Sequence, residues 1–328
     1  MIQKNKWAWA WVPTLYFAQG LPYALVVTVS VIMYKRLGFS NSDLGLYTSL
    51  LYLPWVIKPL WSPFVDLKST KRNWFLGMQL LASVALLAIG LTLPTTIFFI
   101  TSLACFWMVA FASATNDIAT DGYYMIGLTE DKQSFFVGMR SVFYKLASVT
   151  GQGLLVVLAG FLENKYGDNT KAWSYTMLCA GSLMLLMTLS NFFVTPKFEN
   201  SAAISLEKPK SFLEVFVSFF KKPGMGIAIL FILFFRLGES QLVKMAAPFL
   251  LDPTSVGGLG YSTSEVGTIY GTIGVVFLTI GGILGGILIS RQGLKKWMLP
   301  MLISLNAPNA LYALLALTGT TETWAVVG

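Results

Sequence analysis

The 328-residue sequence predicts an all-α polytopic membrane protein made of two related helix bundles. Three observations lead to this prediction. The residues are 55% hydrophobic and only 12% charged, about half the charged share of a soluble globular chain. Apolar runs long enough to cross ~30 Å of hydrocarbon recur along the chain. Two loop sequences also occur twice at nearly the same spacing, as in membrane proteins built from repeats.

The apolar runs predict nine membrane helices, and a tenth begins near Thr323. The first run follows Lys4 and Lys6 but is too long for a signal peptide and lacks a small-residue cleavage site, so we expect it to be uncleaved. The nine expected helices cover residues 7–34, 44–65, 74–92, 96–127, 134–162, 172–194, 224–250, 264–290 and 295–318.

Basic residues set the predicted topology. With the N-terminus in the cytoplasm, 14 of the 23 Lys and Arg residues fall inside, 4 fall outside and 5 lie within the helices. This bias predicts a multi-pass protein whose N-terminus is cytoplasmic. The net charge of +8 does not indicate nucleic-acid binding, because the basic residues form no single patch and their distribution fits a membrane topology better.

The longest polar stretch divides the chain into three parts. We expect an N-terminal six-helix bundle over residues 1–195, a cytoplasmic linker over 196–223 and a truncated C-terminal helix bundle over 224–328. Within the linker, the sequence "FLEVFVSFF" (212–220) predicts an amphipathic helix that lies on the bilayer surface.

An internal repeat relates the two bundles. The stretch "LGFSNSDLG" (37–45) recurs as "LGYSTSEVG" (259–267), each with a Ser-x-x-Asp/Glu capping box before a helix. The stretch "SPFVDLKSTKRNW" (62–74) recurs at nearly the same offset as "GGILISRQGLKKW" (285–297). The matches predict two parallel repeats of six helices, of which the second is incomplete, so that about 9–10 of 12 helices are present.

The second copy of this loop resembles the loop motif of major facilitator transporters, G-x-x-x-D-R-x-G-R-[RK], with Ser290 in place of the acidic residue. The first copy keeps the acid but has lost the glycines. The resemblance implies the major facilitator fold. It also implies gating roles for the loop residues Asp66, Lys71, Arg72, Arg291, Gly293, Lys295 and Lys296.

Within that superfamily, the chain resembles the AmpG-type muropeptide permeases and the related acetyl-CoA transporters. The likeness is carried by "FAQGLPYAL" (17–25), "LPWVIKPLWSPFVD" (53–66) and "FASATNDIATDGYY" (111–124). In "VFYKLAS" (142–148), Lys145 stands where the family has Arg. The resemblance implies proton-driven import of anhydro-muropeptides, which are anionic sugar-peptides, by a monomer in the bacterial inner membrane, for cell-wall recycling.

Other functions stay open on the sequence. A transporter of the same class could carry another organic anion, such as acetyl-CoA, a siderophore or a drug. A non-transporting receptor or scaffold is a more remote alternative. The chain has no histidine, no Cys-centred nucleophile site and no nucleotide motif, which argues against a membrane enzyme. We therefore expect no cofactor and no metal site.

Asp117 and Asp121 stand one turn apart on one face of the fourth expected helix, next to Asn116. Two like charges on one face favour the uptake of a proton by one of them, so we expect roles in proton coupling or in binding. The alternative is a gate latch, in which the two acids pair with Arg140 or with the basic loop 68–72. Counting ~20 residues from the start of the helix places the pair near its cytoplasmic end.

Basic side chains within the helices are candidates for cargo contact, because a charge at the bilayer centre costs at least ~2.5 kcal/mol. Lys145, beside Tyr144, suits the carboxylates of an anionic cargo. Arg140 opens the fifth expected helix, where snorkelling or a salt bridge competes with binding. Lys58 is either a binding charge or a snorkelling side chain that reaches the inner boundary near Asp66.

Arg236, Ser240 and Lys244 follow helical spacing on one face of the seventh expected helix, which lines the cavity in the superfamily, and Glu239 stands three residues after Arg236. Arg236 and Glu239 could form a structural pair, whereas Lys244 lacks an acidic partner within a turn and is the better cargo contact. Gln19 in the first helix aligns with Glu239 in the repeat. We therefore expect Lys145 and Lys244 to contact cargo, and the acidic residues to serve coupling or gating.

Glycines on the eighth expected helix predict close helix contact. Three pairs lie one turn apart, an arrangement that lets another backbone approach: Gly267 with Gly271, Gly281 with Gly285, and Gly282 with Gly286. The stretch "GTIYGTIG" (267–274) follows no strand and lacks the Gly-Lys-Ser/Thr ending of a phosphate-binding loop, so it does not indicate nucleotide binding.

Overall fold

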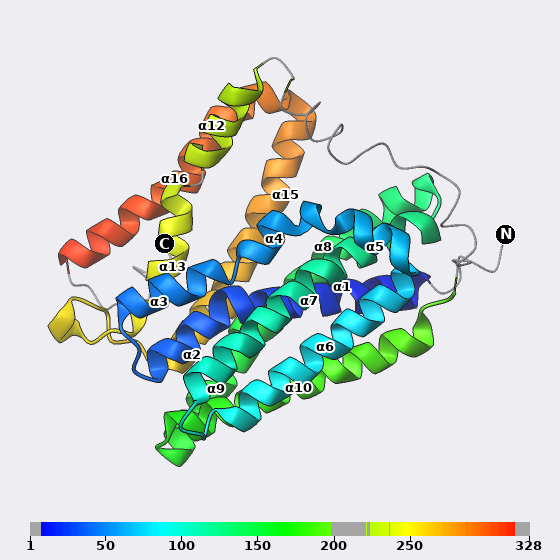
Figure 1. The fold of residues 1–328 in the computed structure, drawn as a ribbon. Coiled ribbons are helices and arrows are strands. Elements are labelled where there is room, and N and C mark those ends of the chain that lie inside the picture. The colour runs from blue at the N-terminus through cyan, green and yellow to red at the C-terminus, as the bar shows by residue number, and fades with distance from the viewer. Residues whose placement is uncertain (1–7, 198–220, 222–223, 236, 319–328) are drawn as a thin grey trace. The chain divides into compact units, whose positions relative to one another are not determined.

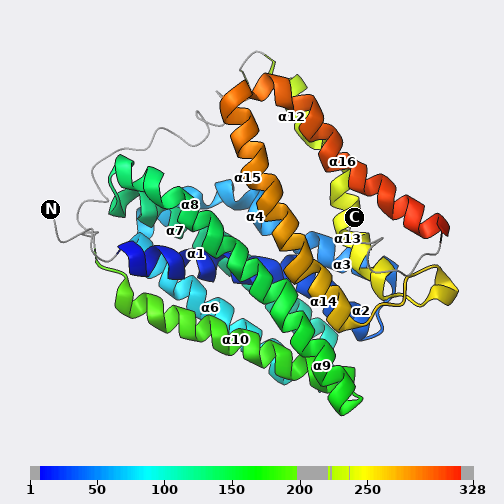
Figure 2. The ribbon, with the colours of Figure 1, turned by 180° about the vertical axis from the view of Figure 1, so that it is seen from behind.

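The computed structural model describes residues 8–197, 221, 224–235 and 237–318, and these residues form helices and turns without a strand (Figures 1 and 2). The chain forms two compact units. The first comprises the residues up to Leu206 together with Thr263–Gly271, and the second comprises Glu207–Ser262 and Thr272–Gly328. Most of the expected linker lies outside the described residues, so its surface helix and the domain boundaries inferred from the repeat stay predictions.

Five helical segments of the first unit are long and apolar enough to cross a membrane. They confirm the first, third, fourth, fifth and sixth expected helices. The first and fifth contain a single π-helical stretch, at Leu25–Val29 and Val149–Leu155. The helices are α1 (Ala8–Ala24) with α2 (Ser30–Arg36), α6 (Lys71–Thr92), α7 (Phe98–Gly127), α8 (Glu130–Ser148) with α9 (Val156–Tyr166), and α10 (Asn169–Val194).

The second expected helix, over 44–65, is wrong as a continuous element. The structure breaks it into α3 (Asn41–Leu50), α4 (Leu53–Ile57), a 3₁₀ turn at Lys58–Leu60 and α5 (Ser62–Lys68). Each break has a nearby proline, because a proline removes one backbone donor and clashes with the preceding turn. The prolines of this segment are Pro54, Pro59 and Pro63.

The remaining helices follow the expected order. The seventh is described as α12 (Met225–Phe235) and α13 (Leu237–Leu251), on either side of residue 236, which lies outside the described residues. The eighth consists of α14 (Thr263–Thr268), a π-helical stretch (Ile269–Ile273) and α15 (Gly274–Gln292), and the ninth is α16 (Leu294–Thr318). The first capping box is confirmed, since the Ser40 hydroxyl accepts a hydrogen bond from the Asp43 amide over 3.2 Å.

Buried polar side chains tie α6, α7 and α10 of the first unit together. The Gln79 amide donates to Asn116 Oδ1 over 3.1 Å, and the Asn191 amide donates to Gln79 Oε1 over 2.9 Å. All three side chains are buried. Lipid tails give little hydrophobic drive for helix association, so hydrogen bonds of this kind help hold membrane helices together. In Figures 1 and 2, α6 and α10 accordingly run side by side.

Glycines allow α9 and the start of the eighth helical segment to approach closely within the first unit. A Cβ on Gly267 would lie 2.8 Å from the Val157 amide nitrogen, and a Cβ on Gly153 would lie 2.6 Å from the Gly271 Cα. The expectation of close helix contact is confirmed at Gly267 and Gly271. It is wrong at Gly281, where a Cβ would meet no atom of the described residues within 4 Å, and a Cβ on Gly285 would meet only the Met301 side chain at 3.1 Å.

Glu163, on α9, joins four segments at the same seam. Its buried carboxylate forms a 3.0 Å ion pair with Arg36 of α2. It also accepts hydrogen bonds from Trp173 Nε1 of α10 over 2.9 Å and from the Thr263 hydroxyl of α14 over 2.6 Å. A carboxylate with this many donors is stabilised in its buried, charged form, and its loss leaves several donors without a partner.

We therefore expect Glu163→Ala to lower stability strongly, by about 3 kcal/mol, because a buried ion pair that loses one partner leaves the other uncompensated. The measurement is the melting temperature of the purified protein in detergent. Glu163→Gln, which keeps an acceptor oxygen, should melt between the wild type and the alanine variant. An alanine variant that melts with the wild type contradicts the role assigned to this carboxylate.

Candidate functional site on helix α7

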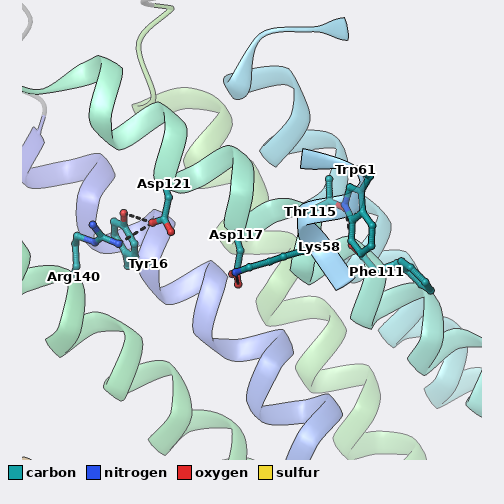
Figure 3. A network of polar contacts seen from close by, with 8 residues as sticks. All are labelled: Tyr16, Lys58, Trp61, Phe111, Thr115, Asp117, Asp121 and Arg140. Atoms are coloured by element: carbon teal, nitrogen blue, oxygen red, sulfur yellow. Dashed lines mark hydrogen bonds and ion pairs between the residues drawn. The ribbon is translucent and has the colours of Figure 1, made fainter. Parts of the chain in front are cut away.

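Helix α7 presents two acidic side chains on one face, and each of them pairs with a basic side chain from another segment (Figure 3). The acids, Asp117 and Asp121, are one turn apart. The helix has 30 residues and is therefore ~45 Å long, which exceeds the hydrocarbon thickness. Because the helix is longer than the hydrocarbon layer is thick, counting residues from its start does not fix the depth of the two acids in the membrane. Their position near the inner end therefore stays a prediction.

Asp121 pairs with Arg140 of α8. An Arg140 Nη2 to Asp121 Oδ1 distance of 2.8 Å makes this a charge-assisted hydrogen bond, and the Tyr16 hydroxyl donates to the same oxygen over 2.9 Å. The guanidinium group also lies over two rings, 4.4 Å from the centroid of Tyr16 and 4.6 Å from that of Tyr124. Arg140 is thus held by one carboxylate and two aromatic faces.

Asp117 pairs with Lys58, the first residue of the 3₁₀ turn in the broken segment. The Lys58 Nζ to Asp117 Oδ2 distance is 3.5 Å, and the Asp117 side chain is only 15% exposed. The Gln19 amide of α1 also interacts with this carboxylate. Lys58 therefore reaches toward Asp117 of α7 (Figure 3), and the choice between a binding charge and a snorkelling side chain stays a prediction.

The two pairs neutralise charges that would otherwise be costly inside a membrane. At an effective dielectric constant of 20, two opposite unit charges 4 Å apart attract by about 4 kcal/mol, so the loss of one charge changes the energy of the other substantially. Binding of a proton by either carboxylate would remove its charge and loosen its hold on the basic partner. The arrangement can therefore couple the binding of a proton to the release of the Lys58 or Arg140 side chain.

Tyr144 and Lys145 lie on α8, and Tyr144 is close to the Asp117 carboxylate. A Cβ on Gly20 of α1 would come within 2.8 Å of the Tyr144 carbonyl oxygen, so the two helices nearly touch there. The Tyr144 ring lies 6.3 Å from the ring of Tyr23. Lys145 is half-buried, and among the residues that the structure describes it has no hydrogen-bond or ion-pair partner.

Asn116 lies apart from both pairs. Its side chain belongs to the buried polar network of α6, α7 and α10, where it also accepts from Thr120 over 3.4 Å. Adjacent residues on a helix point to different faces. Asn116 is therefore not grouped with the two acids, although it stands next to Asp117 in the sequence.

The loop-motif residues of the first unit have structural contacts. Arg72 is buried and donates to the carbonyl oxygens of Thr195 (2.9 Å) and Phe192 (2.6 Å), which lie at the C-terminal end of α10. A cation there satisfies free carbonyl groups and favours the helix dipole. Lys71 is also buried, and a Cβ on Gly122 would meet its side chain at 2.9 Å. Asp66 is helical, but its side chain lies outside the described part.

The site residues predicted in the second half belong to the second unit. Its loop-motif residues are exposed, and Gly293 adopts a φ of 81°, which favours glycine. Arg236 lies outside the described residues. Glu239 and Lys244 are part of α13, but the structure does not describe their side chains. The exposed loop residues are Arg291, Gly293, Lys295 and Lys296.

Sequence reasoning missed several residues of these networks, and Glu163 and Tyr16 show why. Glu163 stands near Lys165 and the end of its helix, a pattern that suggests a solvated end rather than a buried hub. Tyr16 lies in an apolar run with no periodic signal that separates it from a packed core tyrosine. The described residues hold no group of three or more acidic, Cys or His side chains that could bind a metal ion.

Comparison with known proteins agrees with this architecture. The family model of the Major Facilitator Superfamily matches residues 14–328. The anhydromuropeptide permease of Escherichia coli K12 is 27% identical, with coverage of 93% of this chain and 60% of the permease. The putative transporter AmpG 4 of Rickettsia conorii is 24% identical, with coverage of 85% and 67%. The chain thus spans 60% of the length of the first of these relatives.

A solved structure shows the same fold. The crystal structure of a bacterial homologue of the human lysosomal transporter Spinster, in an inward-facing and unoccupied conformation, superposes with a TM-score of 0.64 at 20% identity. The likeness covers 88% of this chain and 63% of that chain. Because the family model matches residues 14–328, this chain belongs to the major facilitator superfamily of membrane transporters.

Proposed function

We propose that the protein imports anhydro-muropeptides by alternating access, driven by the proton gradient. The observation that carries the coupling is the pair of acid–base contacts on α7, Lys58 with Asp117 and Arg140 with Asp121. The cargo is supported by the printed name of the Escherichia coli relative, an anhydromuropeptide permease. The bacterial inner membrane is the corresponding location, with the N-terminus in the cytoplasm.

In this proposal, Asp117 is the proton acceptor that matters most. It is the more enclosed of the two carboxylates, 15% exposed against 42% for Asp121. Protonation removes its negative charge, so Lys58 loses its partner and becomes free to attract an anionic cargo. Because the proton and the cargo then favour the same state of the pair, their binding free energies are coupled.

Lys145 is the proposed direct contact to the acidic peptide of the cargo. It lies half-buried on α8 without a partner among the described residues, close in sequence to Arg140 and Tyr144. A lysine that lacks a counter-charge within a membrane helix stays costly until an anion arrives. In the second unit, we predict from the sequence that Lys244 also contacts the cargo and that Glu239 takes part in coupling.

Another organic anion, such as acetyl-CoA, is the second candidate cargo. Lys145, which has no partner among the residues that the structure describes, suits an anion of either kind. The two alternatives are separated by uptake of the labelled compounds by the full-length protein in proteoliposomes. Uptake of acetyl-CoA without uptake of anhydro-muropeptide would replace the cargo but leave the coupling arrangement in place. A receptor or scaffold would take up neither compound.

We expect Asp117→Asn to abolish coupling. With an imposed proton gradient, uptake of anhydro-muropeptide by the full-length protein should fall at least about tenfold, while exchange of cargo without a gradient changes less than about threefold. The measurement is uptake in proteoliposomes with and without a protonophore. Asp43→Asn makes the same chemical change on α3 and should leave both rates unchanged. Equal loss of gradient-driven uptake and exchange contradicts the coupling role.

We expect Lys145→Ala to weaken cargo binding. Because Lys145 attracts the anionic group before any step of transport, KM for uptake should rise about tenfold with little change in the maximal rate. Lys165→Ala is the control, since Lys165 is exposed and lies over the Tyr166 ring at the far end of the same helical segment. An unchanged KM at equal protein content would remove Lys145 from the binding site.

A further inference from the structure

Four aromatic side chains gather next to the Lys58–Asp117 pair. The Tyr23 ring is at the centre, with centroids 5.2 Å from Trp55, 6.3 Å from Tyr52 and 6.3 Å from Tyr144. Tyr52 and Trp55 are themselves stacked at 6.1 Å with an interplanar angle of 25°. These rings come from α1, from the turn before α4, from α4 and from α8, and we call them the aromatic cluster.

The aromatic cluster lies deep in the helices rather than at their ends. Tyr23 is near the middle of the 29-residue span Ala8–Arg36, so it does not belong to an aromatic belt at the membrane surface. Tyr52 and Trp55 stand where proline breaks the second helical segment. Transporter binding sites are characteristically formed by such discontinuous helices near the bilayer midplane.

The aromatic cluster differs from the packed core of the same unit. In the core, Trp11, Phe75 and Tyr123 are fully buried against one another. In the cluster, Tyr52 is 42% exposed and Tyr23 is half-buried, so its rings offer faces that the protein does not cover. A purely structural cluster would be expected to enclose its rings as the core does.

Two buried polar atoms next to the cluster lack partners. Among the described residues, neither Trp55 Nε1 nor Gln19 Oε1 has a hydrogen-bond partner, although the two side chains are 9% and 7% exposed. Buried polar groups are almost always hydrogen-bonded, so each of these atoms calls for an explanation. A free donor and a free acceptor beside flat aromatic faces suit a ligand that carries hydroxyl and amide groups.

We propose that the aromatic cluster is a subsite for a sugar ring of the cargo. One face of a pyranose ring is lined with C–H groups and stacks on an aromatic ring, while its polar substituents need hydrogen-bond donors and acceptors at the ring edge. Tyr52 supplies the stacking surface, and Trp55 is stacked against it and buried. Trp55 Nε1 and Gln19 Oε1 supply the donor and the acceptor. The inference rests on the proposed function, because it assigns the sugar part of the same cargo.

The charges nearby favour a neutral ring over a cationic group. Aromatic faces also bind cations, but Lys58 stands three residues after Trp55 and would repel a cation once protonation of Asp117 removes its partner. The cargo would then be divided between two neighbouring regions. Its sugar lies on the aromatic cluster, and its acidic peptide lies toward the lysine of α8.

The test measures binding of two fragments to the purified full-length protein: the sugar of an anhydro-muropeptide without its peptide, and the peptide without its sugar. Tyr52→Ala removes the most exposed ring of the cluster. Tyr166→Ala is the matched control, because Tyr166 is 39% exposed and also contacts another tyrosine ring. Trp55→Phe keeps a ring and removes only the indole N–H, so it tests the donor without opening a cavity.

We expect Tyr52→Ala to weaken sugar binding at least about tenfold and Trp55→Phe to weaken it about threefold, with peptide binding and the control variant unchanged. A wild-type protein that does not bind the sugar fragment overturns the subsite, as does a Tyr52→Ala variant that binds it normally or loses both fragments equally. Uptake of intact anhydro-muropeptide by the wild type tests the proposed cargo separately. If the wild type takes up intact anhydro-muropeptide but Tyr52→Ala binds the sugar fragment normally, the subsite is contradicted and the proposed cargo is not.

Discussion

The ion pair between Lys58 and Asp117 is the constraint from which the rest of the site follows. An ammonium group in a membrane segment needs a counter-charge, and the Asp117 carboxylate of α7 provides it at 3.5 Å. Lys58 stands in the 3₁₀ turn of a segment broken by prolines. The same break places Trp55 against Tyr23. One local irregularity of the backbone thus brings together a charge pair and an aromatic surface.

The sequence predicted the long helices well because their signal is simple. A run of about 20 apolar residues has few other stable forms in a membrane. The broken segment was harder, because its hydropathy is continuous and only the prolines mark the breaks. The pairing of Arg140 with Asp121 was one of two alternatives, and the pairing of Lys58 with Asp117 was not foreseen. Contacts between distant segments depend on helix rotation, which hydropathy does not determine.

The seam around Glu163 complements the pairs on α7. There α9 and α14 approach through glycines, and one buried carboxylate holds Arg36, Trp173 and Thr263. A contact between helices that is made by small residues and a few hydrogen bonds can separate in one step. The proposed alternating-access mechanism needs at least one helix contact that separates in this way. Glu163 could not be identified from sequence, since its partners come from three other helices and no local pattern distinguishes it.

The most direct test of the account is a double-mutant cycle on Lys58 and Asp117 in the full-length protein, with Lys58→Met and Asp117→Leu, read as melting temperature. Each single change leaves one charge without its partner, so both single variants should be destabilised, by several kcal/mol at most. The double variant removes both charges and should melt close to the wild type, because the two changes are coupled. A double variant destabilised by the sum of the single effects would contradict the pair as the interaction that organises this site.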